Sequence, residues 1–356
     1  MGATKATALV PTHEHGPLLG FAVRSALAQT VDEIEVFIVC DGATDDTLEA
    51  AEELSKLDDR VRLFVHDKGP RHGEVYRHRA LQEASGDIVC YLSDDDLWLP
   101  DHVATMARLL ESANFAHAYP MGLGIDGRPF SWPGHLSLAE VRQSLLEGRN
   151  FIPLSCGAHT LEFYRRLRYG WRTAPADTHS DLYMWQQILS VDGVRVASGG
   201  EATVLHFPSS YRVDMTIEER VDELARWAAA TTTPDFTADL NRGIHEHLVV
   251  EWARSAVRQG ALTQQVTDTR DRLAILEADL GAAKAELARV NTRLTDELDK
   301  SVRDAEHVEQ VEERISKLQD ELGWMTNSRT WRLRASVLGI PGVARLVRRA
   351  GIARSR

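Results

Sequence analysis

Short apolar runs alternate with stretches of helical periodicity between Thr7 and Tyr119, and this alternation constrains the fold more than any other feature. The runs have the length of strands, and the stretches between them carry apolar residues at three- and four-residue spacing. The strand-like runs are residues 6–10, 34–40, 61–65, 87–92 and 115–119, and the helix-like stretches are residues 18–29, 46–57, 75–84 and 102–111. This order predicts an α/β fold, a doubly wound and mostly parallel sheet with flanking helices.

The sequence after this region changes character twice. Residues 120–215 are less regular, with glycine and proline scattered among aromatic residues, and we expect them to complete the same domain. Residues 217–260 have a helical composition and end at Gly260, which suggests a junction there.

A heptad pattern follows from Leu273. The apolar seam comprises Leu273, Leu276, Leu280, Ala283, Leu287, Val290 and Leu294, and it resumes at Val308, Val311, Ile315, Leu318, Leu322 and Met325. Glu297, Ser301 and Asp304 interrupt it. This spacing predicts a coiled coil, which needs self-association or a partner helix to cover its stripe.

Charge is distributed unevenly along the chain. The formal net charge is −12, yet residues 326–356 contain eight arginines and no acidic residue. An acidic main domain argues against specific nucleic-acid binding. The tail interleaves arginine with apolar residues such as Trp331, which indicates either a segment that lies on an anionic membrane surface or a solvated basic tail.

The expected location follows from the cysteines and from hydropathy. Cys40, Cys90 and Cys156 lie far apart, and two of them fall in apolar strand-like runs, as expected of reduced, buried thiols. The sequence shows no pattern of a standard secretion signal or of a membrane span. We therefore expect a cytoplasmic protein, with the tail as a peripheral contact to the inner face of the plasma membrane.

Polar residues follow each of the first four strand-like runs. They are Pro11–Glu14, Asp41–Asp46, His66–Arg71 and Ser93–Asp96. Because ligands of open α/β sheets bind beyond the carboxyl ends of the strands, we expect these residues to converge on one edge.

The cluster of Asp94, Asp95 and Asp96 is the most specific of these features. Adjacent carboxylates repel one another unless they share a cation, and oxygen ligands suit Mg²⁺ or Mn²⁺. Such an ion could bridge a diphosphate and offset the charge of a departing nucleotide. The alternative is helix capping ahead of Pro100 and Asp101.

These motifs resemble the family 2 glycosyltransferases, which have the GT-A fold. The run YLSDDDLWLPDH at 91–102 is similar to their acidic motif, CDGATDDT at 40–47 to their Asp-rich loop, and EASGDIVCYL at 83–92 to the approach to the metal strand. The resemblance covers residues 5–130 well and thins out between 130 and 215. It implies a GT-A glycosyltransferase domain at 1–215, followed by a helical extension at 216–260, a coiled coil at 261–325 and a basic amphipathic tail at 326–356.

The resemblance also implies site residues. The residues expected to bind the nucleotide-sugar are Pro11, Thr12, Glu14, Asp41, Asp67, Arg71 and Asp94, and the expected metal ligands are Asp95, Asp96 and His206. Asp41 would bind the base, although it could instead initiate an Asx turn, and His206 could be an ordinary hydrogen-bonded residue. Ser93 and Cys40 depart from the family pattern, because many members have aspartate at both positions.

An inverting transfer needs a base that takes the proton of the acceptor hydroxyl. The family places an acidic residue before a downstream helix, and Asp181 is similar to it, with Asp177 and His179 as alternatives. Asp181 could instead cap that helix.

The acceptor class follows from similarity as well. The Ser-x-x-Trp-Arg segment at 328–332 is similar to one that follows coiled coils in bacterial cell-surface polysaccharide enzymes, which implies a glycan or lipid-linked acceptor. Processive members carry Gln-x-x-Arg-Trp and membrane helices, whereas this chain has ELARW at 223–227 and no apparent span, which disfavours polymer extrusion.

Two other functions stay open at this point. A nucleotidyltransferase shares the sheet and the acidic edge, but it needs a glycine-rich basic loop after the first strand, and PTHEHG at 11–16 is a poor version. A catalytically inactive glycosyltransferase-like scaffold that acts through its coiled coil is the other alternative.

Overall fold

The computed structural model describes residues 4–132, 134–233, 235–300 and 312–320. The chain divides into two compact units, Met1–Val249 and Val250–Arg356. The first unit contains the sheet and all the expected site residues.

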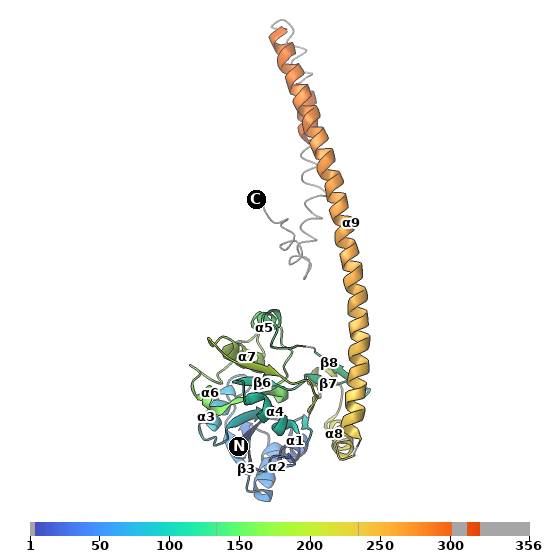
Figure 1. Ribbon diagram of the computed structural model, residues 1–356. Helices are drawn as coiled ribbons and strands as arrows, with labels where there is room; N and C mark the ends of the chain where they lie inside the picture. The colour runs from blue at the N-terminus through green and yellow to red at the C-terminus, as the bar shows by residue number, and fades with distance from the viewer. Residues whose placement is uncertain (1–3, 133, 234, 301–311, 321–356) are drawn as a thin grey trace. The chain divides into compact units, whose positions relative to one another are not determined.

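A seven-stranded sheet forms the centre of the first unit (Figure 1), in the order β10-β6-β9-β4-β1-β2-β3. Its strands are β1 (Ala6–Thr12), β2 (Ile34–Asp41), β3 (Val61–His66), β4 (Ile88–Tyr91), β6 (Phe115–His117), β9 (Gly157–Thr160) and β10 (Val196–Ser198). The neighbours β4, β1, β2 and β3 are parallel, as are β6 and β10. The predicted mostly parallel α/β sheet is confirmed.

The helices expected between the first strands are also present. They are α1 (Gly16–Leu27), α2 (Asp45–Leu57), α3 (Glu74–Gln82) and α4 (His102–Leu110). Helix α1 packs against β1 and α2, and α3 packs against β2. Because parallel crossovers are right-handed, α1 and α2 cover one face of the sheet and α3 the other.

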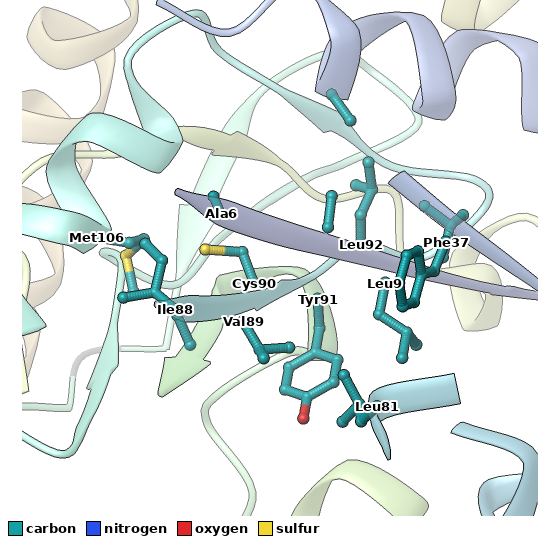
Figure 2. Close-up of a cluster of buried hydrophobic side chains, with 14 of the residues drawn as sticks. Ala6, Leu9, Phe37, Leu81, Ile88, Val89, Cys90, Tyr91, Leu92 and Met106 are labelled. Atoms are coloured by element: carbon teal, nitrogen blue, oxygen red, sulfur yellow. The ribbon is translucent and has the colours of Figure 1, made fainter. Parts of the chain in front are cut away.

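The core lies between the sheet and these helices. Figure 2 shows side chains from β1, β2 and β4 meeting Leu81 of α3 and Met106 of α4. Every residue of β4 is buried, because helices cover both faces of a parallel sheet. This packing fixes where each strand ends, and therefore where the polar residues that follow it lie.

Strand β9 is the main feature of the sheet that periodicity does not predict. It lies between β4 and β6 and runs antiparallel to both. Its sequence, GAHT, has little strand propensity, so pairing with its neighbours decides its conformation. A side chain at Gly157 would meet the Trp185 ring at 2.5 Å, so the close packing of that indole requires glycine.

Smaller elements complete residues 120–215. Strand β5 (Leu97–Trp98) pairs with β11 (Val204–Leu205), and β7 (Met121–Leu123) pairs with β8 (Pro129–Ser131). The helices are α5 (Ala139–Leu146), α6 (Leu161–Arg165) and α7 (Ser180–Leu189), with 3-10 turns η1 (Leu154–Cys156) and η2 (Ser209–Tyr211). The β5–β11 pair brings the segment after β11 beside the segment after β4.

Helix α8 (Ile217–Ala230) begins with a capping box. Thr216 accepts from the backbone N–H of Glu219, whose side chain accepts from the backbone of Thr216. This reciprocal pair stabilises the first turn. Leu224 anchors α8 in a second apolar cluster with Leu97 and Leu205.

The long helix α9 (Phe236–Lys300) begins in the first unit, where Leu240 and Ile244 join the same second cluster. It continues through Gly260, where the sequence suggests a junction. From Leu273 to Val290 the half-buried residues are the six predicted seam positions, and their neighbours are exposed.

Residues 312–320 are helical too, while the other seam positions from 301 on, and the basic tail at 326–356, lie outside the described residues. Among the helices that the structure describes, none combines the length and the apolar character needed to cross a bilayer.

Candidate active site

The carboxyl ends of β2, β1 and β4 meet at one edge of the sheet, because these strands are parallel neighbours. Asp41 is the last residue of β2, His15 follows β1, and Asp94, Asp95 and Asp96 follow β4. All three carboxylates of that run are buried, at 8%, 7% and 0% exposure. The predicted gathering of acidic residues on one edge is present.

Four side chains form what we call the outer cluster: His15, Asp94, Asp95 and Arg220. His15 Nδ1 lies 2.9 Å from Asp94 Oδ1, and Arg220 Nη2 donates to Asp95 Oδ2 at 2.6 Å. Arg220 Nη1 lies 3.2 Å from His15 Nε2, so the four residues form one connected network.

The outer cluster contains a set of possible metal ligands. His15, Asp94 and Asp95 offer ligand atoms that lie within 4.8 Å of one another. Two carboxylates with an imidazole suit Mn²⁺, and carboxylates also suit Mg²⁺. These residues fit the cation that the sequence predicts, but the group differs from the expected one, because it joins Asp95 to Asp94 and His15 and does not include Asp96 or His206.

Burial and crowded charge determine the electrostatics of this cluster. Burial, together with the negative charges of Asp96 and Asp94, raises the pKa of Asp95 to about 6. The hydrogen bond with Asp94 raises the pKa of His15, although burial opposes this. A positive group in this cluster, such as the Arg220 guanidinium, therefore offsets the negative charge of the neighbouring carboxylates.

A second network, which we call the inner cluster, consists of Asp96, Ser155 and His206. Ser155 Oγ donates to Asp96 Oδ2, and His206 Nδ1 lies 2.9 Å from the same oxygen. The backbone N–H of Phe207 donates to Asp96 Oδ1 at 2.8 Å. Burial lowers the pKa of His206, but the charge and hydrogen bond of Asp96 outweigh this and raise it overall. Asp96 and His206, both expected metal ligands, thus contact each other directly.

Asp41 holds the loop that follows β3. Its carboxylate accepts from Lys68 Nζ at 2.6 Å and from the backbone N–H of Gly69 at 2.6 Å. Gly73 has a φ of +63°, and a side chain there would meet Asp41 Cγ at 2.4 Å. The loop can therefore close over Asp41 only because residue 73 is glycine.

The same loop reaches the region of the expected catalytic base. Arg71 Nη2 donates to the carbonyl oxygen of Thr178 at 3.1 Å. Asp177 and His179, on either side of Thr178, are exposed, and His179 precedes α7. The loop after β3, which carries expected nucleotide-binding residues, thus contacts the segment that carries the candidates for the base.

Asp181 is more enclosed than its two neighbours. Asn150 Nδ2 donates to Asp181 Oδ2 at 3.0 Å, and the backbone N–H of Leu182 donates to Oδ1 at 2.7 Å. Burial raises the pKa of Asp181, while these hydrogen bonds lower it in part.

The remaining expected residues surround this edge. Thr12 ends β1 and is buried, and its Oγ1 has no hydrogen-bond partner within the part of the chain that the structure describes. Pro11 precedes it and is half-buried, whereas Glu14 and Asp67 are exposed. Glu14 Oε1 lies 3.1 Å from His13 Nε2.

Sequence reasoning does not identify His15, Arg220 and Ser209, which the structure brings to the acidic run. Ser209 Oγ donates to Asp95 Oδ2 at 3.1 Å. The sequence offers one indication of His15, because this residue lies in the polar loop after the first strand. The sequence offers no such indication of Arg220, since it is one charged residue on a helix and lies 125 positions after Asp95.

Comparison with known proteins agrees with this geometry. Residues 7–167 match the family model described as "Glycosyl transferase family 2". This segment runs from β1 to the end of α6 and contains the whole acidic run. The predicted resemblance to family 2 glycosyltransferases is confirmed for this segment.

Among the relatives of this chain, two match about a third of its length. The GalNAc(5)-diNAcBac-PP-undecaprenol beta-1,3-glucosyltransferase of Campylobacter jejuni is 30% identical over 118 residues, which cover 33% of this chain and 37% of the relative. Glycosyltransferase GlyA of Streptococcus pneumoniae is 30% identical over 102 residues, which cover 29% of this chain and 14% of the relative. The match thus spans well under half the length of these relatives.

Several solved structures are similar to 68% of this chain, including the following two. The mannosyltransferase PcManGT of Pyrobaculum calidifontis, in complex with GDP-Man and Mn²⁺, has a TM-score of 0.44 and 17% identity, with 80% of its chain covered. TarS 1–349 of S. aureus, in complex with UDP-GlcNAc, has a TM-score of 0.46 and 16% identity, with 71% covered.

Proposed function

We propose that the chain is a metal-dependent, inverting glycosyltransferase of hexosyltransferase type, which moves a sugar from a nucleotide-sugar to an acceptor hydroxyl. The observation that carries this proposal is the group of His15, Asp94 and Asp95 at the carboxyl edge of the sheet. It lies inside the segment that matches the family 2 model. Position and ligand set together support a cation next to a nucleotide.

Each part of the edge has a separate role in this proposal. Asp94, Asp95 and His15 would hold Mn²⁺ or Mg²⁺, and the ion, when bound, would offset the negative charge of the departing nucleoside diphosphate. Asp96 and His206 hold the acidic run in place from the inside. Asp41 and the loop around it bind the base, and Arg71 binds the diphosphate or the base.

The remaining expected residues lie at the rim of the nucleotide pocket in this proposal. Pro11 and Thr12 line the pocket, and the Thr12 hydroxyl is buried without a partner among the described residues. Glu14 and Asp67 contact the exposed side of the donor.

Asp181 takes the proton of the acceptor hydroxyl in this proposal. A carboxylate with a raised pKa is a stronger base than an ordinary aspartate, and burial raises the pKa of Asp181. The acceptor is a glycan or a lipid-linked glycan of a cell-surface polysaccharide or glycoconjugate. The name of the Campylobacter jejuni relative, which includes PP-undecaprenol, supports a lipid-linked acceptor.

The two alternative functions are not favoured. A nucleotidyltransferase would need a glycine-rich, basic loop after β1, whereas this loop is PTHEHG. An inactive scaffold would not need a set of possible metal ligands, and such a set is present.

The long helix and the tail supply the proposed location. We propose that α9 self-associates, or binds a partner helix, through its heptad seam, and that the basic tail binds the inner face of the plasma membrane. Substitution of Leu280, in the middle of the seam, by Asp should shift the full chain to a smaller species in sedimentation velocity. Flotation with anionic liposomes should recover the intact protein more efficiently than residues 1–325, and equal recovery would remove the membrane contact.

Substitution of Asp95 tests the activity directly. Asp95→Ala should abolish Mn²⁺-dependent hydrolysis of the donor and binding of a nucleoside diphosphate, because the cation loses a central ligand. A thermal-shift screen of nucleoside diphosphates with Mn²⁺ identifies the base, since specific binding stabilises the fold. Asp59→Ala is the matched control, because Asp59 is exposed and follows α2. Unchanged nucleotide binding by Asp95→Ala would contradict the proposal.

A further inference from the structure

Arg220 contacts two of the three possible metal ligands. Its guanidinium contacts Asp95 Oδ2 at 2.6 Å and approaches His15 Nε2 at 3.2 Å. Asp95 and His15 also belong to the group of possible metal ligands, whose third member is Asp94. A guanidinium and a divalent cation would therefore compete for the same carboxylate.

The fold holds the backbone of Arg220 firmly in front of the acidic run. Arg220 lies in the first turn of α8, just after the capping box. Glu223, one turn later, forms a buried pair with Arg212, in which Nε to Oε2 is 2.6 Å and Nη2 to Oε1 is 2.7 Å. This bidentate pair and the buried Leu224 fix α8.

The side chain of Arg220 reaches the acidic run from a helix that packing holds in place, so it could move without its backbone. Among the residues that the structure describes, its guanidinium contacts only Asp95 and His15. The side chain is 12% exposed, so it lies close to solvent. A long side chain on a fixed helix can leave Asp95 without moving the helix.

The charge of the acidic run explains why a resident cation is needed. Three consecutive carboxylates are buried there. Asp95 contacts Arg220, and Asp96 contacts His206. A buried carboxylate without a positive partner is costly. Arg220 therefore stabilises the metal-free state, and this stabilisation must be lost before a metal ion contacts Asp95.

We propose that Arg220 is an internal counter-ion that occupies the cation position between Asp95 and His15, so that a divalent cation binds only when the guanidinium leaves Asp95. This inference rests on the proposed function and adds control of metal loading to it. Arg220 keeps the affinity for the free cation low.

Titration of the full chain with Mn²⁺ alone, followed by calorimetry, tests the inference without any measurement of activity. Arg220→Gln keeps much of the side-chain length but loses the charge, and it should bind Mn²⁺ about tenfold or more tightly than the unmodified protein. Arg226→Gln is the matched control, because Arg226 lies on the same helix, is exposed, and donates to the carbonyl of Asp222. It should bind Mn²⁺ as the unmodified protein does.

Arg220→Lys provides a second variant if Arg220→Gln folds poorly. Lysine keeps the charge but cannot contact Asp95 and His15 with a forked group, so its Mn²⁺ affinity should fall between those of the unmodified protein and Arg220→Gln. Equal or weaker Mn²⁺ affinity in both variants overturns the inference. The absence of Mn²⁺ binding in all of the proteins overturns it as well.

The proposed function is judged separately, on donor hydrolysis and nucleotide binding by Asp95→Ala. If Asp95→Ala loses both while Arg220→Gln binds Mn²⁺ no better, only the inference about Arg220 fails. If the unmodified protein neither hydrolyses a donor nor binds a nucleotide, while Arg220→Gln binds Mn²⁺ more tightly, only the glycosyltransferase proposal fails.

Discussion

Asp95 and Asp96 are neighbours in sequence, but the outer and inner clusters hold them in different ways. Asp96 is fully buried, and its oxygens accept from the Ser155 hydroxyl, the Phe207 backbone and the His206 ring. Asp95 shares one oxygen between Arg220, a partly exposed cation, and Ser209. This difference is what we expect if Asp96 supports the acidic run while Asp95 exchanges Arg220 for a metal ion, as proposed above.

Asp181 lies between these two cases. Like Asp96 it accepts from a neutral side chain and a backbone N–H, but it is only half-buried. Hydrogen bonds that fix its orientation, together with partial exposure, are what we expect of the proposed base.

The largest effect should come from breaking the inner cluster. Asp96→Ala removes the acceptor of a buried hydroxyl and a buried N–H, and it leaves His206 without its carboxylate. We expect the free energy of unfolding to fall by about 3–5 kcal/mol, the usual cost of breaking a buried charged pair. Urea denaturation measures this, with Asp59→Ala as a surface control expected to stay within about 0.5 kcal/mol. A loss as small as that of the control would show that the inner cluster does not support the fold.

A smaller effect, in this case on activity, should come from substitution of Asn150, which donates a hydrogen bond to Asp181. The hydrogen bond from Asn150 favours the carboxylate form, so Asn150→Ala should raise the pKa of Asp181 further. A base acts only when it is deprotonated, and activity therefore falls as the pH drops through this pKa. On the acid side, kcat/KM should decrease by roughly tenfold, with little change at alkaline pH. A pH–rate profile that is lowered equally at every pH would contradict the assignment of Asp181 as the base.

The smallest effect should come from the neutral donor of the outer cluster. Ser209→Ala removes one hydroxyl hydrogen bond to Asp95 but leaves Arg220 in place. We expect the free energy of unfolding to fall by about 1 kcal/mol or less, the typical net contribution of one hydrogen bond. Thermal unfolding of the metal-free protein checks this. A loss as large as that of Asp96→Ala would mean that the outer cluster is as rigid as the inner one.

Local sequence determined the first half of the fold and the acidic edge. Apolar runs and helical periodicity predict β1 to β4, β6 and α1 to α4, because the burial of one helix face or of a whole parallel strand leaves a pattern that is visible over a few residues. Asp94, Asp95 and Asp96 are predictable as a group for the same reason, since they are contiguous and follow a buried strand.

Only the tertiary structure decided the direction of β9 and the partners of the acidic run. Strand β9 is placed by its pairing with β4 and β6 and by the packing of Gly157 under Trp185, and its four residues carry no pattern of their own. Arg220 reaches His15 across 205 positions of sequence, because a capped helix packs at the end of a sheet. The sequence could place the carboxylates, but the groups that neutralise them come from distant segments, and packing alone brings those segments together.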